Sequence, residues 1–197
     1  MLALSESLLA FFHDRLKVYL KDKGRRYDAI DAVLAKADGS LEDDLVLIVR
    51  KLEALEAFLE TDDGANLAAA YKRAANIVKA EEKKDVGRMK SAGAGAASEA
   101  AEFNRAMVDE KCLQQAEEKA LYAALAKAEE KAAKAVAAEK FADAMSALAS
   151  LRPAVDAFFD KVTVNADDRD LRANRLALLQ RFIAATASAA DLGRLEG

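Results

Sequence analysis

Apolar residues recur every three or four positions along most of the chain, and only one proline interrupts them. At positions 4, 8, 12, 16 and 20 the spacing is four, with Phe11 and Tyr19 beside this stripe. Such spacing marks one face of an α-helix, and proline is the residue that breaks helices most strongly. Because alanine is also abundant, the sequence predicts an all-α fold, a helical bundle of six or seven helices.

The helix boundaries follow from glycine, serine and proline residues between the apolar stripes. Gly24 is expected to end the first helix, Ser40 to cap the third, and Pro153 to bend or split the sixth. The predicted helices lie at about 4–23, 27–37, 41–60, 65–84, 113–138, 140–162 and 167–191.

One segment lacks an apolar stripe. The stretch VGRMKSAGAGAASEAAEF (86–103) is rich in glycine, alanine and serine, a composition typical of flexible connections. We therefore predict one domain over residues 1–197 with a flexible insertion at about 86–110. Since the first helix begins almost at Met1, we also expect the chain to be a fragment of a longer protein.

Known catalytic and metal-binding motifs are missing from the sequence. A single histidine, His13, and a single cysteine, Cys112, do not make a zinc site, and we expect His13 on the polar flank of its helix. GAGAAS lacks the preceding strand and the following lysine of a phosphate-binding loop. There is no signal peptide and no run of about 18 apolar residues, so no membrane segment is expected. The single cysteine fits a cytoplasmic protein.

Basic residues gather in two places although the net charge is −4. The first helix and the turn after it carry Arg15, Lys17 and Lys21, with few acidic residues among them. In YKRAANIVKAEEK, the residues Lys72, Asn76, Lys79 and Lys83 are four, three and four apart and so share one helical face. Three cations and an amide in a row suit a phosphate backbone and one base edge, although a solvated helix face would have the same pattern.

The last predicted helix places two charges inside its apolar face. Arg172 and Arg175 fall within the arc of Leu171, Leu176 and Leu179. A buried guanidinium without a partner costs several kcal/mol, so each arginine needs a partner or access to water. Two interpretations stay open: an internal ion pair, with Asp156 or Asp160 as the carboxylate, or a groove in which the arginines meet an external anion.

Six phrases follow one another along the chain: FFHDRLKVYL (11–20), YDAIDAVL (27–34), DDLVLIVRKLEAL (43–55), YKRAANI (71–77), VDAFFDKVTVNADD (155–168) and LRANRLALL (171–179). Together they resemble the C-terminal region of bacterial glycyl-tRNA synthetase beta subunits, which is similar to the DALR anticodon-binding domain of arginyl-tRNA synthetases. The resemblance covers nearly the whole chain, with gaps mainly at 86–110. Asp170–Leu171–Arg172 lacks the alanine of the motif that names the domain, which leaves the role of Asp170 open.

The resemblance implies a function. The beta chain joins an alpha chain in a heterotetramer, and the alpha chain activates glycine with ATP and Mg²⁺. The present chain would bind the anticodon arm of tRNA(Gly), as a part of a glycine–tRNA ligase that holds no catalytic site and no cofactor of its own. In this interpretation Arg172, Asn174 and Arg175 contact the bases. The expected backbone-contacting residues are Arg15, Lys17, Lys21, Lys72 and Lys79, with Asn76 beside them.

A second class of function also fits. The alanine-rich helix predicted at 113–138 and the acidic balance would suit a non-catalytic helical scaffold that binds a protein partner. Arginyl-type specificity is a third possibility, which the set of phrases favours less. RNA binding, and its response to changes at the two arginines, separates the first two classes.

Overall fold

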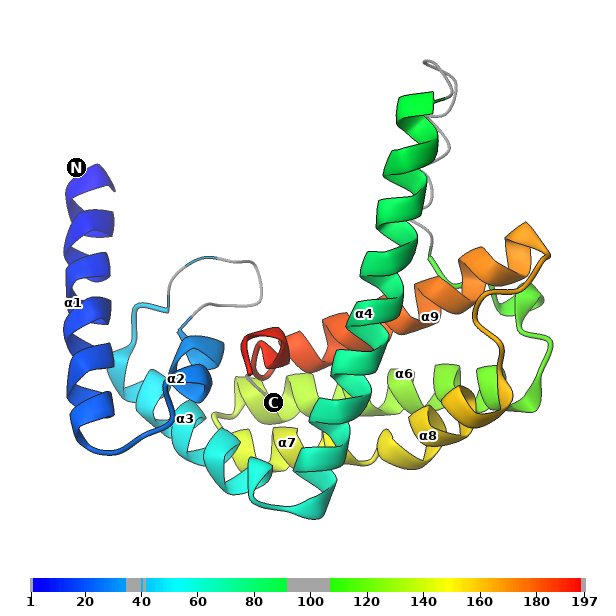
Figure 1. Ribbon diagram of the computed structural model, residues 1–197. Helices are drawn as coiled ribbons and strands as arrows, with labels where there is room; N and C mark the ends of the chain where they lie inside the picture. Colours follow the sequence, from blue (N-terminus) through cyan, green and yellow to red (C-terminus); the bar gives the residue numbers. More distant parts are fainter. Residues whose placement is uncertain (1, 35–39, 41, 92–106, 196–197) are drawn as a thin grey trace.

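The computed structural model describes residues 2–34, 40, 42–91 and 107–195, and these residues contain helices but no strand (Figure 1). The predicted all-α helical fold is confirmed. In chain order the elements are α1 (Leu2–Asp22), α2 (Tyr27–Val33), α3 (Leu45–Leu59), α4 (Asp62–Ser91), the 3-10 helix η1 (Glu110–Cys112), α6 (Ala116–Ala137), α7 (Phe141–Ala149), α8 (Arg152–Lys161), α9 (Arg169–Ala187) and the 3-10 helix η2 (Leu192–Arg194).

The body of the molecule is built around α6 and α9. Helix α6 packs against α7, α8 and α9, and α4 crosses this group in contact with α9 and α8. The second half of α4 projects beyond the body, and α1 stands at the opposite end of the molecule against α2 (Figure 1). The short η2 lies between these two projecting helices and contacts both α2 and α4.

The apolar stripes predicted from the sequence form one continuous core. In α9, Leu176, Leu178, Leu179 and Phe182 are almost completely buried. They pack with residues such as Leu52 of α3, Leu67 of α4 and Leu121 of α6. The core therefore joins the first and last thirds of the chain and fixes α4 against α9.

Two predicted helix ends are right and one helix start is wrong. Gly24 has φ +80°, the left-handed conformation expected after a helix. The sixth predicted helix is split, with Pro153 in the first turn of α8, where its missing N–H costs nothing. The third helix, however, begins at Leu45 and not at about 41. Its cap is Asp44, whose Oδ1 accepts from the N–H of Val46 at 2.9 Å and of Leu47 at 3.0 Å.

Part of the segment predicted as a flexible insertion at about 86–110 is helical instead. Helix α4 continues to Ser91, because the lysine- and glutamate-rich sequence around residue 82 favours helix and a single glycine costs only about 1 kcal/mol. Residues 92–106 lie outside the described residues. From 107 the chain is extended and then forms η1.

Candidate RNA-binding surface

A groove of about 730 Å³ lies between the first half of α4 and the segment around η2. Alanines of α4 form much of its wall, because their small side chains leave room beside the helix. Leu59, Ile183, Leu192 and Leu195 add larger apolar surface. A volume of this size falls within the range of small-molecule pockets. Most of the remaining lining residues are polar or charged and come from α4 and from Arg26.

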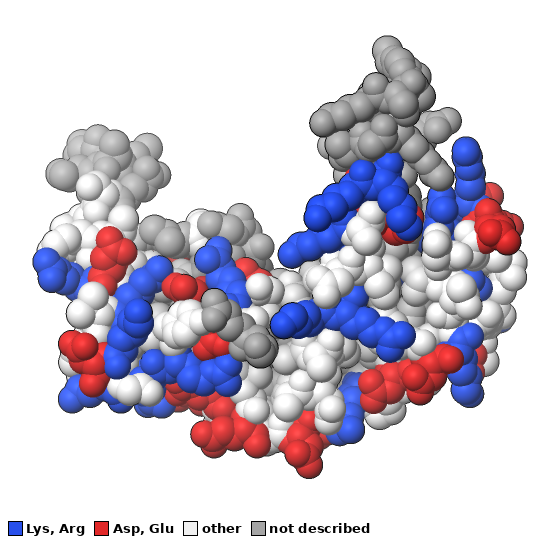
Figure 2. Space-filling view, in the orientation of Figure 1, with Lys and Arg blue, Asp and Glu red and all other residues white. Residues whose placement is uncertain are grey.

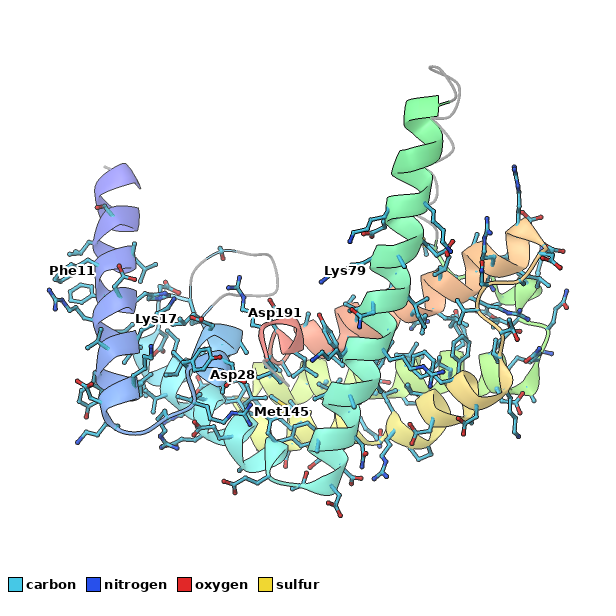
Figure 3. The ribbon with its side chains drawn as sticks, in the orientation of Figure 1. Phe11, Lys17, Asp28, Lys79, Met145 and Asp191 are labelled. Carbon is cyan, nitrogen blue, oxygen red and sulfur yellow. The ribbon has the colours of Figure 1, made fainter. Side chains whose placement is uncertain are left out.

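The three predicted residues Lys72, Asn76 and Lys79 of α4 line this groove, together with Tyr71 and the acidic Glu82 of the same helix. All three are exposed, and within the described part of the chain none of them forms a hydrogen bond or an ion pair. In Figure 3, Lys79 extends from α4 toward the side of the molecule that carries α1. The shared face predicted from the spacing is therefore present, and its donors are free for an external ligand.

The floor of the groove includes residues that the sequence analysis did not single out. Tyr71 is buried under η2, where Gly193 allows close packing, since a Cβ at that position would lie 2.9 Å from Tyr71 Oη. Burial, with the negative charge of Asp191 nearby, raises the pKa of the Tyr71 hydroxyl, so this group stays neutral. η2 is 121 or more positions from Tyr71 in the sequence, so no local pattern could have joined them.

Figure 2 shows a hollow on the same face, between α1 and the projecting half of α4. Lysine and arginine side chains border it along α4. On the α1 side, Lys17 points toward α2 and forms an ion pair of 2.9 Å with Asp31 (Figure 3). The groove and this hollow together make a concave surface with cations on both sides.

The three basic residues predicted on α1 do not form one site. Lys17 is engaged with Asp31, as described above. Lys21 Nζ lies 5.7 Å from the centre of the Tyr27 ring. The guanidinium carbon of Arg15 lies 5.3 Å from the centre of the Phe11 ring. Arg15 is two positions from Lys17, so the two side chains leave the helix about 160° apart. Only Lys17 and Lys21 remain on a common side, and Arg15 is separated from the hollow.

Arg175 does not face an external ligand, and the prediction that it contacts RNA is corrected. It is 6 % exposed, and its Nε donates to Glu118 Oε1 at 2.5 Å, while Glu118 is only 1 % exposed. Its Nη1 donates to the carbonyl oxygen of Thr163 at 2.8 Å. The internal ion pair is thus the right alternative, but its carboxylate is Glu118 of α6 and not Asp156 or Asp160. Asp156 lies instead 3.6 Å from Arg152.

Asn174 is also used inside the protein, and its predicted base contact is corrected in the same way. Its Oδ1 accepts from the N–H of Asp109 at 2.7 Å, and its Nδ2 donates to the carbonyl oxygen of Asp109 at 3.0 Å. Both ends of the amide are therefore satisfied by the backbone that precedes η1. Asn174 fixes that segment onto α9.

Arg172 differs from its two neighbours. It is partly exposed and, among the described residues, has no hydrogen-bond or ion-pair partner. It does not line the groove, and it lies eleven positions before Ile183, which at 1.5 Å per residue is about 16 Å along α9. Arg172 stays a candidate RNA contact, but at a second position on the surface.

The described residues contain no group of three or more histidine, cysteine, aspartate or glutamate side chains placed to hold a metal ion. None of the helices described is both long and apolar enough to cross a membrane.

The comparison with protein families gives the class of protein to which this helical chain belongs. The sequence model of the DALR anticodon binding domain matches residues 67–192, which run from α4 to η2. The chain belongs to this family. Most residues that line the groove, including Lys72, Asn76 and Lys79, lie within the matched residues.

Similar curated proteins give a more particular result. The chain is 50 % identical over 190 residues to the glycine–tRNA ligase beta subunit of Rhodospirillum centenum, and 50 % identical over 190 residues to that of Cereibacter sphaeroides. Each match covers 96 % of this chain but only 24 % and 25 % of those relatives. The chain thus spans about a quarter of the length of the curated relatives it matches.

Proposed function

We propose that this chain binds the anticodon arm of tRNA(Gly) as the C-terminal domain of a glycine–tRNA ligase beta subunit. Membership of the anticodon binding family and the identity to two such subunits support this function. The structural observation that carries it is the row of unpaired donors, Lys72, Asn76 and Lys79, along an apolar groove.

The groove suits an unstacked nucleotide of an RNA loop. Bases in such loops expose both their faces and their edges, so apolar and planar protein surface can take up a base. We propose that Lys72 and Lys79 hold the phosphates on either side of one nucleotide, and that Asn76 bonds the edge of its base. The lysines would set position and affinity, whereas the amide would contribute to the choice of base.

In this proposal, another subunit of the enzyme carries out the catalytic steps. An alpha subunit would bind ATP and Mg²⁺ and activate glycine, and the two kinds of subunit would form the cytoplasmic ligase. The present chain would position the tRNA.

Titration with RNA tests the proposed function directly. Labelled tRNA(Gly) should bind to the 197-residue chain, and the logarithm of the affinity should fall linearly with the logarithm of salt concentration, by about 0.7 per phosphate contact. Fluorescence anisotropy at salt concentrations between about 0.05 and 0.2 M measures this slope. A tRNA of another specificity is the control. Affinity that does not depend on salt, or no binding at all, would contradict the proposal.

Arg172→Ala tests whether the second position on α9 also contacts RNA. Because Arg172 has no partner among the described residues, its replacement should change the free energy of unfolding by less than about 1 kcal/mol relative to the parent chain. If a base lies there, the preference for tRNA(Gly) over a tRNA of another anticodon should fall by about 1–3 kcal/mol. Competition titrations measure this difference. An unchanged preference would place the RNA on the groove alone.

The alternative function, a scaffold that binds a protein partner through residues 113–138, finds less support. Helix α6 already packs against α7, α8 and α9. Its exposed positions carry lysines such as Lys119, Lys127 and Lys131 between alanines, which is typical of a solvated face. Among the described helices, α1 exposes the most large apolar side chains.

A further inference from the structure

The outer face of α1 is a stripe of large apolar side chains in contact with solvent. Their relative exposures lie between 45 % and 57 %. The stripe runs over three turns of the helix and is formed by Leu8, Phe11, Phe12, Val18 and Tyr19. Single exposed apolar residues are normal on a protein surface, but a contiguous stripe of this kind marks an interaction site.

The opposite face of α1 is apolar as well and already has a partner. Leu20 is buried against the rest of the protein and Leu16 is partly buried there. His13, expected on a polar flank, is buried instead, with Nε2 2.6 Å from the carbonyl oxygen of Glu42. Lys17 and Lys21 lie on a further side of the helix, so α1 has two apolar faces and one polar side. In the described residues, α1 packs chiefly on α2, so only one of its two apolar faces is covered.

The chemistry of the stripe favours a protein partner. Arg15 lies within the stripe with its guanidinium over the Phe11 ring, and Lys23 Nζ lies 5.6 Å from the centre of the Tyr19 ring, so cations lie within and beside the aromatic surface. Aromatic residues with arginine are enriched in the cores of protein interfaces. Phe11 points away from the hollow that carries Lys79 (Figure 3), so an RNA in that hollow would leave the stripe uncovered.

The lengths of the relatives indicate where such a partner comes from. The matches cover 190 of the 197 residues, so at most seven residues of the chain fall outside the matched span, and most of α1 lies within it. About three quarters of each relative has no counterpart in this chain. The stripe also lies before residue 67, outside the part that matches the anticodon binding family.

We infer that the outer face of α1 is the surface by which this domain docks onto the rest of a longer ligase polypeptide. The occupant is a segment of that polypeptide with an apolar ridge and acidic flanks, which complements the stripe and its cations. The inference rests on the proposed function, because it takes the chain to be a part of such a subunit. The stripe on α1 then faces the docked polypeptide, while the proposed RNA-binding surface lies on the other side of α1, toward α4.

Hydrogen exchange in the polypeptide encoded by the complete reading frame tests this inference. The amides of α1 should exchange at least about 10-fold more slowly there than in the 197-residue chain, because docking protects the helix. Phe11→Asp should remove this difference. Val46→Asp is the matched control, since Val46 is a 63 % exposed apolar residue on α3, and it should change nothing. In the 197-residue chain both variants should melt within about 4 °C of the parent.

Several results would overturn the inference. Equal exchange of α1 in both proteins, or a reading frame that adds no further polypeptide, would show that no such segment covers the stripe. A dimer of the 197-residue chain that Phe11→Asp abolishes in sedimentation would assign the stripe to a second copy. A loss of tRNA(Gly) affinity in Phe11→Asp would assign it to RNA. If tRNA binding fails while α1 is protected as expected, the proposed RNA function fails and the docking surface stands.

Discussion

Replacement of Arg175 by alanine should lower the free energy of unfolding by about 3–5 kcal/mol, because it leaves the carboxylate of Glu118 buried without its counter-ion. Glu118 is 1 % exposed, so water cannot take the place of the guanidinium without opening the core between α6 and α9. The same change also removes the bond to the Thr163 carbonyl oxygen. For a chain of this length the melting temperature should fall by about 6–20 °C.

Urea denaturation followed by circular dichroism at 222 nm measures this loss. Arg172→Ala is the matched control, because it removes the same side chain from the same helix one turn earlier, where no partner is lost. Its cost should stay below about 1 kcal/mol. If Arg175→Ala is as mild as Arg172→Ala, the ion pair with Glu118 does not stabilise the fold in solution.

A double-mutant cycle separates the ion pair from the other role of Glu118. Its Oε2 accepts from the N–H groups of Gln114 and Gln115, both at 2.7 Å, and so caps α6. Glu118→Leu therefore loses this cap as well, at about 1 kcal/mol. The combined variant Arg175→Met with Glu118→Leu should be more stable than the sum of the two single losses indicates, by roughly 0.5–3 kcal/mol. The RNA affinity of each folded molecule should stay that of the parent.

The ion pair also shows where inference from the sequence reaches its limit. The apolar periodicity predicts α9 and its buried leucines because those signals are local. The charge of Arg175 inside the stripe is just as visible, but its partner lies 57 positions earlier in α6. Periodicity predicts in which direction a side chain leaves its own helix. It does not predict which other helix packs against that side. The choice between an ion pair and a ligand site therefore required the packing of α6 on α9.

The common face of Lys72, Asn76 and Lys79 on α4 was predictable from local spacing, whereas the partner of Arg175 was not. Lys72, Asn76 and Lys79 belong to one helix, so their spacing alone puts them on one face. What the spacing does not contain is the other wall of the groove, where Leu192 and Gly193 of η2 meet Tyr71. That wall depends on a contact between distant segments. The sequence therefore predicts the row of cations but not the groove beside them in which a ligand could bind.

The double variant Lys72→Ala with Lys79→Ala should lose most of the affinity of this surface for RNA. If each lysine meets one phosphate, the salt slope should fall by about 1.4, since one contact to a single strand contributes about 0.7. The same relation gives a loss of about 15-fold at 0.15 M salt and about 65-fold at 0.05 M salt. All RNAs should be weakened alike, because phosphate contacts carry no sequence information. Anisotropy titrations of tRNA(Gly) and of a second tRNA at both salt concentrations measure these losses.

Lys127→Ala with Lys131→Ala is the matched control for this prediction. The two residues are exposed, have no ion-pair partner among the described residues, and lie on α6, away from the groove. This variant changes the net charge of the protein by the same amount, so a loss caused by charge alone would be equal in both. We expect the control to bind RNA within about 2-fold of the parent, since charges more than a Debye length of about 8 Å from the RNA are largely screened at 0.15 M salt. Equal losses in the two double variants would mean that net charge and not the groove holds the RNA, whereas a loss confined to Lys72 and Lys79 locates the phosphates beside Asn76.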